Sequence, residues 1–288
     1  MIRLSAPFGL LCALALGCAS AKPTGTAGSG GTSAPVLTIG AVPLGEQAVR
    51  TRELDALAQV LERELGGRVD LSVAADYREF SKGLAERRWD LIVVGPVLYS
   101  RAHENGYDAV AIGMRGGTFV RQGLFITRAD KGISRIADLK GRKLAFVSPH
   151  SSSGFQFPFA YLFAQGLGPA DYTREFVGSH DAVVKAVLEG RADAGATYDG
   201  ALEDLAGDQA ALLTVFARTD PIPGETFAIR ADCTRLPKVR EVLLGLHQRE
   251  DTKALLAILH ADELVAPPPG VFEAAKGIDL LVTEAAGL

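Results

Sequence analysis

The chain has 288 residues, of which 48% are hydrophobic and 22% are charged, and its formal net charge at pH 7 is −4. This mildly acidic balance, with lysine and arginine scattered along the chain, excludes the concentrated basic surface of a nucleic-acid-binding protein. The length is sufficient for one large domain or two smaller ones.

The N-terminal segment has the features of a secretory leader. A short basic start precedes the apolar run Leu10–Leu16, which is too short to span a membrane as a stable helix. The run ends in Leu-Ala-Leu-Gly-Cys18, which resembles the bacterial lipoprotein cleavage box. We therefore expect residues 1–17 to be a signal peptide and Cys18 to carry a lipid anchor. The alternative is an ordinary secretory signal that is cleaved at a nearby small residue.

Residues 18–35 are expected to form a flexible tether behind the lipidated Cys18. From Ala19 to Pro35 the chain contains glycine, serine, threonine, alanine and proline, with Lys22 as the one charged residue. Cys12 would leave with the leader and Cys18 would be lipidated, so Cys233 has no partner for a disulfide. We expect Cys233 to be a packed thiol.

After Val36 the chain alternates short apolar runs with longer amphipathic ones. The strands that this pattern predicts are Val36–Val42, Val69–Val73, Leu91–Val94, Ala109–Met114, Leu124–Thr127, Lys143–Val147, Glu175–Val177, Ala192–Thr197, Leu213–Ala217 and Phe227–Ile229. The predicted helices are Val49–Leu65, Tyr77–Arg87, Pro96–Asn105, Ser134–Leu139, Gly154–Gly166, Asp181–Glu189, Gly200–Leu205, Lys238–His247, Lys253–Leu259 and Phe272–Leu281. Such alternation indicates an α/β fold with mainly parallel sheets.

Two sheets suit this length better than one. A crossover is expected at residues 115–118 and a return at residues 218–225. Lobe I would then comprise residues 36–117 plus 226–288, and lobe II residues 118–225. Ligands of such folds bind in a cleft at the carboxyl ends of the strands.

A serine-rich loop lies at such a strand end. Ser151, Ser152, Ser153 and Gly154 separate the predicted strand from a helical pattern that begins at Phe155. Hydroxyl groups beside the free N–H groups of a helix N-terminus suit an oxyanion. The alternative is a simple helix cap, which requires one of the three serines.

Several motifs resemble the phosphate-, phosphite- and phosphonate-binding proteins of ABC importers. They are Asp138–Val147 followed by Ser151–Phe155 with Pro158 and Tyr161, Ala75–Tyr77, Trp89–Leu91 with Gly95-Pro96, Ser179–Val183 and Gly190–Ala196. Together they span nearly all of the mature domain in the order of that family. The resemblance implies a two-lobed periplasmic-binding-protein type 2 fold that closes on its ligand by a hinge. It also implies a monomer that needs no cofactor and delivers its ligand to a permease in the inner membrane.

The resemblance assigns ligand-binding roles to particular residues. Ser151, Ser152 and Ser153 match a run that binds the phosphonate oxygens, and His180 matches a histidine that donates a further hydrogen bond. Tyr77 matches a tyrosine that reaches the same oxyanion from the other lobe. From the residues alone, a helix cap at His180 and a core-edge position for Tyr77 are favoured, but their register with the serine loop favours the ligand-binding roles.

The wall for the remainder of the ligand departs from the family pattern. Glu225 matches an acidic position that holds an ammonium group in relatives that take aminoalkylphosphonates. Ala201 stands where a second glutamate is expected, although Asp199 could substitute for it. Val94 replaces an aromatic residue, with Tyr99 one helical turn further on. The cage for a cationic tail is therefore incomplete, and phosphite, phosphate and a small alkylphosphonate are alternatives to an aminoalkylphosphonate.

Two rival functions are open at this stage. An enzyme could use Ser152, His180 and Asp220 as a triad, but the chain has no Gly-x-Ser-x-Gly elbow. The histidines show no metal-ligand spacing, so we expect neither catalysis nor a metal. The second rival is a lipid-anchored sensor of the same fold that passes its signal to a signalling partner.

From the leader and the expected anchor, we expect a lipoprotein on the periplasmic face of the membrane.

Overall fold

The computed structural model describes residues 36–42, 47–203 and 207–287. Cys18, the expected signal peptide and the expected tether lie outside the described residues. Within the described part, no helix combines the length and apolar character needed to cross a membrane.

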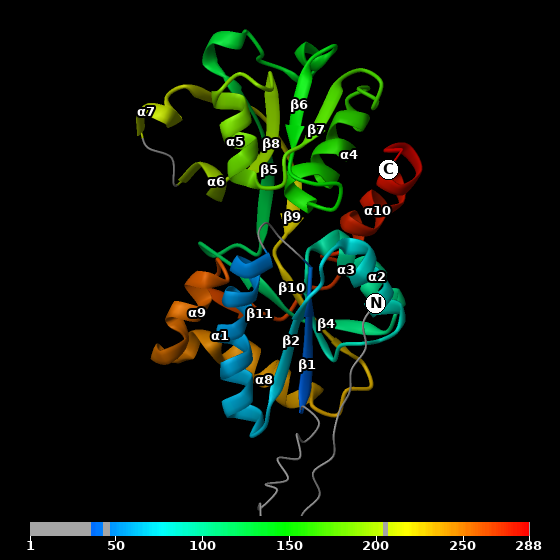
Figure 1. Ribbon diagram of the computed structural model, residues 1–288, viewed down its shortest axis with the longest axis vertical. Helices are drawn as coiled ribbons and strands as arrows, with labels where there is room; N and C mark the ends of the chain where they lie inside the picture. The colour runs from blue at the N-terminus through cyan, green and yellow to red at the C-terminus, as the bar shows by residue number, and fades with distance from the viewer. Residues whose placement is uncertain (1–35, 43–46, 204–206, 288) are drawn as a thin grey trace, which may run out of the picture. The chain divides into compact units, whose positions relative to one another are not determined.

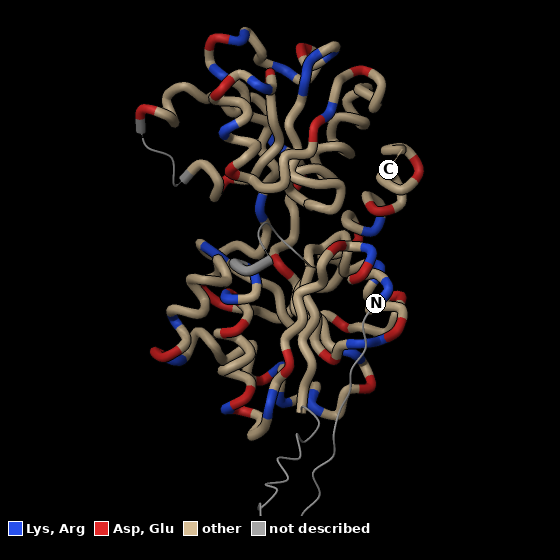
Figure 2. Tube along the Cα trace, in the orientation of Figure 1, with Lys and Arg blue, Asp and Glu red and all other residues tan. Residues whose placement is uncertain are grey.

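The strands and helices alternate as expected for an α/β protein (Figure 1). Basic and acidic residues are scattered over the described chain (Figure 2). The strands are β1 (Leu37–Ala41), β2 (Val69–Val73), β3 (Leu91–Val94), β4 (Tyr107–Met114), β5 (Val120–Arg128), β6 (Lys143–Phe146), β7 (Thr173–Phe176), β8 (Ala194–Tyr198), β9 (Leu213–Pro223), β10 (Thr226–Arg230) and β11 (Glu263–Val265). The helices are α1 (Gln47–Leu65), α2 (Tyr77–Ala85), α3 (Pro96–Glu104), α4 (Phe157–Ala164), α5 (His180–Leu188), α6 (Gly200–Glu203), α7 (Gly207–Ala210), α8 (Leu236–Gly245), α9 (Lys253–Ile258) and α10 (Glu273–Ala285).

Lobe I is built on a six-stranded sheet with the order β11-β4-β10-β3-β1-β2. Apolar residues of α1, α8 and α9 pack on one face, including Leu57, Leu243 and Leu256. Phe80 of α2 and Ala102 of α3 pack with Trp89 on the other face. The sheet is therefore covered on both sides, and its central strand β3 is buried along its whole length.

Lobe II is built on a five-stranded sheet with the order β7-β6-β8-β5-β9. Phe155, Phe159 and Leu162 form one core beside this sheet, and Val183 and Val187 of α5 belong to the core on the other side. Each sheet thus carries core residues on both of its faces, and a smaller apolar cluster of Val97, Phe157, Ile222 and Ala275 joins the two lobes.

Both sheets are mixed, which corrects the expectation of mainly parallel sheets. In lobe I, β1 pairs in parallel with β2 and β3, but β10 enters antiparallel between β3 and β4. In lobe II, β6 pairs in parallel with β7 and β8, whereas β5 pairs antiparallel with β8 and β9. The difference lies at the first strand after each crossing between the lobes. β5 enters the sheet of lobe II, and β10 enters the sheet of lobe I, each in the direction opposite to the parallel strands of that sheet.

The two crossings between the lobes run side by side. The Gly113 N–H donates to the Glu225 carbonyl at 3.0 Å, and the Gly224 N–H donates to the Phe119 carbonyl at 2.8 Å. A side chain at position 224 would place its Cβ 2.5 Å from the Gly113 carbonyl oxygen, so the close approach requires glycine. Glu225 consequently lies on the connection between the lobes.

The C-terminal helix contacts both lobes. It packs on α3 and on α4, and Asp279 accepts hydrogen bonds from Arg101 of α3. Val282 and Ala286 belong to the core of lobe II, although the sequence assigns their segment to lobe I. The reason is that α10 is amphipathic and its apolar face meets α4 across the lobes.

The serine loop leads into a π-helical turn, η3 (Ser152–Gln156), which continues into α4. The Ser151 hydroxyl accepts a hydrogen bond from the Gly154 N–H at 3.1 Å and caps this turn. A Cβ at Gly154 would lie 2.3 Å from Val147 Cγ2, so only glycine allows the turn to pack against β6 and its end.

Replacing Gly154 by alanine should therefore destabilise the fold by about 1–3 kcal/mol, because the extra methyl group overpacks the loop against Val147. The measurement is urea denaturation of both proteins. Gly245→Ala is the matched control, since no atom lies within 4 Å of its added Cβ. Equal stability of Gly154→Ala and Gly245→Ala would contradict this account of the turn.

Candidate ligand-binding site

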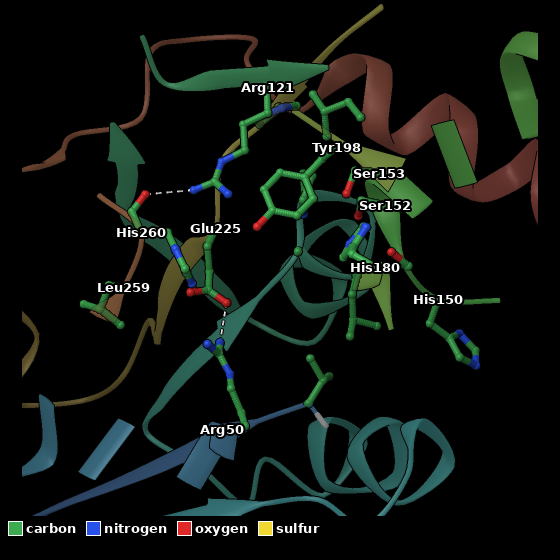
Figure 3. Close-up of a pocket in the computed structure, with 18 of the residues that line it drawn as sticks. Arg50, Arg121, His150, Ser152, Ser153, His180, Tyr198, Glu225, Leu259 and His260 are labelled. Atoms are coloured by element: carbon green, nitrogen blue, oxygen red, sulfur yellow. Dashed lines mark hydrogen bonds and ion pairs between the residues drawn. The ribbon is translucent and has the colours of Figure 1, made fainter. Parts of the chain in front are cut away.

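A cavity lies between the two lobes, beside their crossings (Figure 3). Lobe I contributes Arg50, Tyr77, Gly95 and Pro96, together with Glu225 from the connection. Lobe II contributes the serine loop, Arg121, His150, His180 and Tyr198. Tyr77, Ser151, Ser152, Ser153, His180 and Glu225, all expected from the sequence, therefore line one cavity.

Helix N-termini from both lobes converge on this cavity. Tyr77 is the first residue of α2, Gly95 caps α3, Ser152 begins η3, and His180 begins α5. In three of these elements the preceding side chain caps the first turn, through Asp76, Ser151 and Ser179 respectively. The N-termini carry partial positive charge, so together they create a positive potential that suits an anion.

The three serines do not have the same environment. Ser151 is buried, and its hydroxyl is engaged in the cap. The Ser152 and Ser153 hydroxyls have no hydrogen-bond partner among the described residues and lie on the cavity side in Figure 3. A Cβ at Gly95 would lie 3.0 Å from Ser152 Oγ, so this hydroxyl reaches the start of α3 in the opposite lobe.

His180 is held as a neutral imidazole at neutral pH. Burial, followed by the charge of Arg121, lowers the pKa of His180 to about 4. Its Nδ1 lies 3.0 Å from Thr197 Oγ1, and its ring meets the Tyr198 ring edge-on at 4.7 Å between centroids. Because Nδ1 already faces Thr197, Nε2 is the ring atom available for another polar partner.

Tyr77 and His150 form an aromatic contact across the lobes. Their rings stack with centroids 4.0 Å apart. Burial raises the pKa of the Tyr77 phenol to about 12, against the opposing effects of a hydrogen bond with the Ser148 side chain and the charge of Arg50. Tyr77 is thus a protonated phenol at neutral pH and can donate a hydrogen bond.

Glu225 is paired with Arg50, a buried residue of α1 that the sequence analysis missed. Arg50 donates to Glu225 Oε1 and, at 3.3 Å, to Glu53 one turn along the same helix (Figure 3). Burial acts to lower the pKa of Arg50, but the charges of the two carboxylates outweigh it and raise the pKa. Arg50 is spaced with Leu54, Leu57 and Leu61 on the buried stripe of α1. This helical spacing is the sequence feature that could have identified Arg50 as a buried arginine.

Arg121 lies on the same side of the cavity as Glu225 in Figure 3. Its guanidinium carbon is 5.8 Å from the centroid of the Tyr198 ring, within the range of a cation–π interaction. It also donates a hydrogen bond to the His260 carbonyl at 3.0 Å. No local sequence pattern marks Arg121, because only the folding of β5 beside β8 brings it to Tyr198.

Tyr99 and Asp199 do not line this cavity, contrary to expectation. Tyr99 is buried in the core between α3 and β4, where its hydroxyl accepts a hydrogen bond from the Ala109 N–H at 3.1 Å. One helical turn after Pro96, its side chain is on the inner face of α3. Asp199 follows β8 and borders a neighbouring surface pocket with Arg115 and Gly200.

The described residues contain no group of histidine, cysteine and acidic side chains that could hold a metal ion. The alternative triad does not assemble either. His180 Nδ1 faces Thr197, and Asp220 is exposed on β9. Cys233 is half-buried beside the lobe I core, as a packed thiol would be.

The lowered pKa of His180 predicts a pH-dependent stability. The unfolded chain binds a proton near pH 6.5 whereas the folded chain does so near pH 4, so stability falls as the pH drops through this window. Between pH 7 and pH 5 this histidine should account for a loss of about 2 kcal/mol. Chemical denaturation of wild type and His180→Gln at both pH values measures the difference. An equal pH dependence in the two proteins would contradict the neutral buried imidazole.

Three comparisons relate the chain to known proteins. Residues 39–268 match the family described as "ABC transporter, phosphonate, periplasmic substrate-binding protein". The phosphate-import protein PhnD of Mycolicibacterium smegmatis is 30% identical over 226 residues, covering 73% of this chain and 70% of that protein. The structure of PhnD1 from Prochlorococcus marinus in complex with methylphosphonate has a TM-score of 0.75 at 20% identity, covering 86% of this chain and 98% of the other.

A binding-protein component of a phosphonate ABC transporter from Pseudomonas aeruginosa has a TM-score of 0.73 at 20% identity, covering 86% of this chain and 87% of the other. These structural similarities confirm the two-lobed periplasmic-binding-protein type 2 fold. The family match extends over most of the described residues. The chain therefore belongs to the family of periplasmic substrate-binding proteins of phosphonate ABC transporters.

Proposed function

We propose that the protein captures a phosphorus oxyanion in the cavity between its lobes and delivers it to the permease of an ABC importer. The observation that carries this proposal is the convergence of helix N-termini from both lobes beside the Ser152 and Ser153 hydroxyls. Free N–H groups and hydroxyls are the donors that a tetrahedral oxyanion requires. The names of relatives agree in ligand class, since one imports phosphate and another was solved with methylphosphonate.

In this proposal both lobes hold the same anion. Ser152 and Ser153 donate from lobe II, together with the N–H groups of η3, and neutral His180 donates from Nε2. The Tyr77 phenol donates from lobe I. Because the donors belong to different lobes, a bound anion stabilises the arrangement in which the lobes are in contact.

Thermal denaturation with a panel of anions tests the ligand class. Phosphate, phosphite, methylphosphonate and 2-aminoethylphosphonate are compared with sulfate. A bound ligand at 100 times its Kd should add about 2.7 kcal/mol to the free energy of unfolding. If no phosphorus anion raises the melting temperature, the proposed function is wrong.

Within the same experiment, Ser152→Ala should weaken binding of the stabilising anion by about 1.5–3 kcal/mol, the value of a hydrogen bond to a charged group. Ser151→Ala is the matched comparison, because the Ser151 hydroxyl caps η3. Its removal should lower stability by about 1 kcal/mol. If Ser152→Ala binds the anion with unchanged affinity, the serine loop only caps the helix and does not bind the ligand.

We also propose that the mature protein is a lipoprotein that is anchored through Cys18 on the periplasmic face of the membrane. The cleavage-box resemblance and the polar tether after Cys18 support this assignment. A tether of this composition lets the domain reach a permease while it remains attached.

Cys18→Ser should abolish lipid attachment, because the thiol is the acceptor of the lipid. Membrane fractionation and metabolic labelling with a fatty-acid analogue of cells that produce either protein measure the effect. The variant should lose the label and leave the membrane fraction. Retention of both would contradict the anchor.

A further inference from the structure

This inference concerns the part of the ligand that extends beyond the oxyanion, and it rests on the proposed function. The cavity wall on the side of Glu225 contains two features that attract an ammonium group. One is the Glu225 carboxylate and the other is the face of the Tyr198 ring. Whether this wall accepts a cationic tail depends on what these two groups already contact.

Glu225 already forms an ion pair with an arginine of the same chain. Arg50 donates from its guanidinium to Glu225 Oε1, and the exposed fractions of the two side chains are 6% and 18%. Arg50 also contacts Glu53, so the guanidinium is held between two carboxylates. An arginine keeps its charge at every physiological pH, so this pairing cannot be relieved by proton loss.

The Tyr198 ring likewise already contacts a cationic side chain of the protein, Arg121. Arg121 lies over this ring, and its hydrogen bond to the His260 carbonyl holds the guanidinium there. Tyr198 contacts His180 on its other side, so the ring links the imidazole of the anion cradle to Arg121. In Figure 3 the guanidinium groups of Arg121 and Arg50 lie above and below Glu225, and both lie to the left of Ser152 and Ser153.

We propose that Arg50 and Arg121 are specificity-determining residues, which occupy with their guanidinium groups the two places where this wall could hold a cationic tail. The ligand is then a phosphorus oxyanion without an ammonium group, such as phosphate, phosphite or methylphosphonate. An aminoalkylphosphonate must bring its ammonium beside two fixed positive charges and lose its hydration, and the described residues of the lining offer no unpaired carboxylate to replace the water.

The charges explain why the two arginines act on the tail and not on the anion itself. Arg50 and Arg121 are matched in the cavity lining by Glu53 and Glu225, and His180 is neutral at pH 7. The attraction for the oxyanion therefore comes from helix N-termini and hydroxyls, which remain in place when either arginine is changed. Removing Arg50 leaves the carboxylates of Glu225 and Glu53 without their arginine, whereas removing Arg121 uncovers the face of the Tyr198 ring.

The test is isothermal titration calorimetry of the purified protein with methylphosphonate and 2-aminoethylphosphonate, for wild type, Arg50→Gln and Arg121→Gln. In wild type, methylphosphonate should bind at least about tenfold more tightly than 2-aminoethylphosphonate. Arg50→Gln should narrow this ratio by about tenfold, because Glu225 becomes available to the ammonium. Arg121→Gln should narrow it by about threefold through the Tyr198 ring.

Matched variants separate specificity from damage to the fold. Arg50→Gln combined with Glu225→Gln should bring the ratio back toward the wild-type value, since Glu53 is then the one carboxylate of the former Arg50 pairs that remains. Arg240→Gln removes an exposed arginine of α8 outside the cavity and should leave the ratio unchanged. Melting curves show whether each variant folds. If Arg50→Gln fails to fold, the affinity ratio of Arg121→Gln tests the inference, because Arg121 is only half-buried.

The outcomes distinguish this inference from the proposed function. Tight binding of 2-aminoethylphosphonate by wild type, or an unchanged ratio in folded Arg50→Gln and Arg121→Gln, overturns the inference and leaves phosphorus-anion capture intact. Absence of binding by every phosphorus anion in wild type overturns the proposed function, and the inference fails with it.

Discussion

The site depends on the unpaired N–H groups at the start of helices that face each other across the two lobes. A helix leaves its first N–H groups without intrahelical partners, and these groups must find acceptors elsewhere. In α2, η3 and α5 the residue just before the cavity supplies one acceptor through its side chain, as Asp76, Ser151 and Ser179 do. The next residue of each element lines the cavity, so capping the helix and lining the cavity are divided between adjacent positions.

This arrangement makes backbone dipoles, and not net charge, the source of attraction for an anion. The arginines of the wall are engaged with Glu225, Glu53 and the Tyr198 ring, and the low pKa of His180 keeps it neutral. Dipoles that are fixed by secondary structure need no rearrangement when a ligand arrives. In our proposal the charged side chains then serve a different task, the selection of what the oxyanion carries.

The lobes themselves are joined by few but specific contacts. The crossings are held together by hydrogen bonds at Gly113 and Gly224, and α10 packs on helices of both lobes. Near the cavity, the stack of Tyr77 on His150 and the approach of Ser152 to Gly95 bridge the gap. Glu225 lies on the second crossing, so the Arg50 contact ties the connection between the lobes to α1 of lobe I.

Local sequence patterns located most of the strands and helices and most of the expected site residues that line the cavity. Strand-helix alternation located β2 and β3 at their observed bounds, and the serines between β6 and α4 marked a loop that lines the cavity. Patterns of this kind succeed because periodicity and capping are encoded within a few residues. The short strand β11 and the direction of β5 and β10 were not predicted, because strand direction depends on partners that are distant in the sequence.

The opposite wall could be decided only by the tertiary structure. The sequence by itself determined which side chains were available for this wall, namely the carboxylate of Glu225 and the aromatic ring of Tyr99, one helical turn after Pro96. Folding placed Arg50, 175 positions away, on that carboxylate and turned Tyr99 into the core. It likewise brought Arg121 over Tyr198, through the pairing of β5 with β8. The physical reason is that helix N-termini are local features, whereas a charge pair depends on which distant side chains the packing of whole elements brings together.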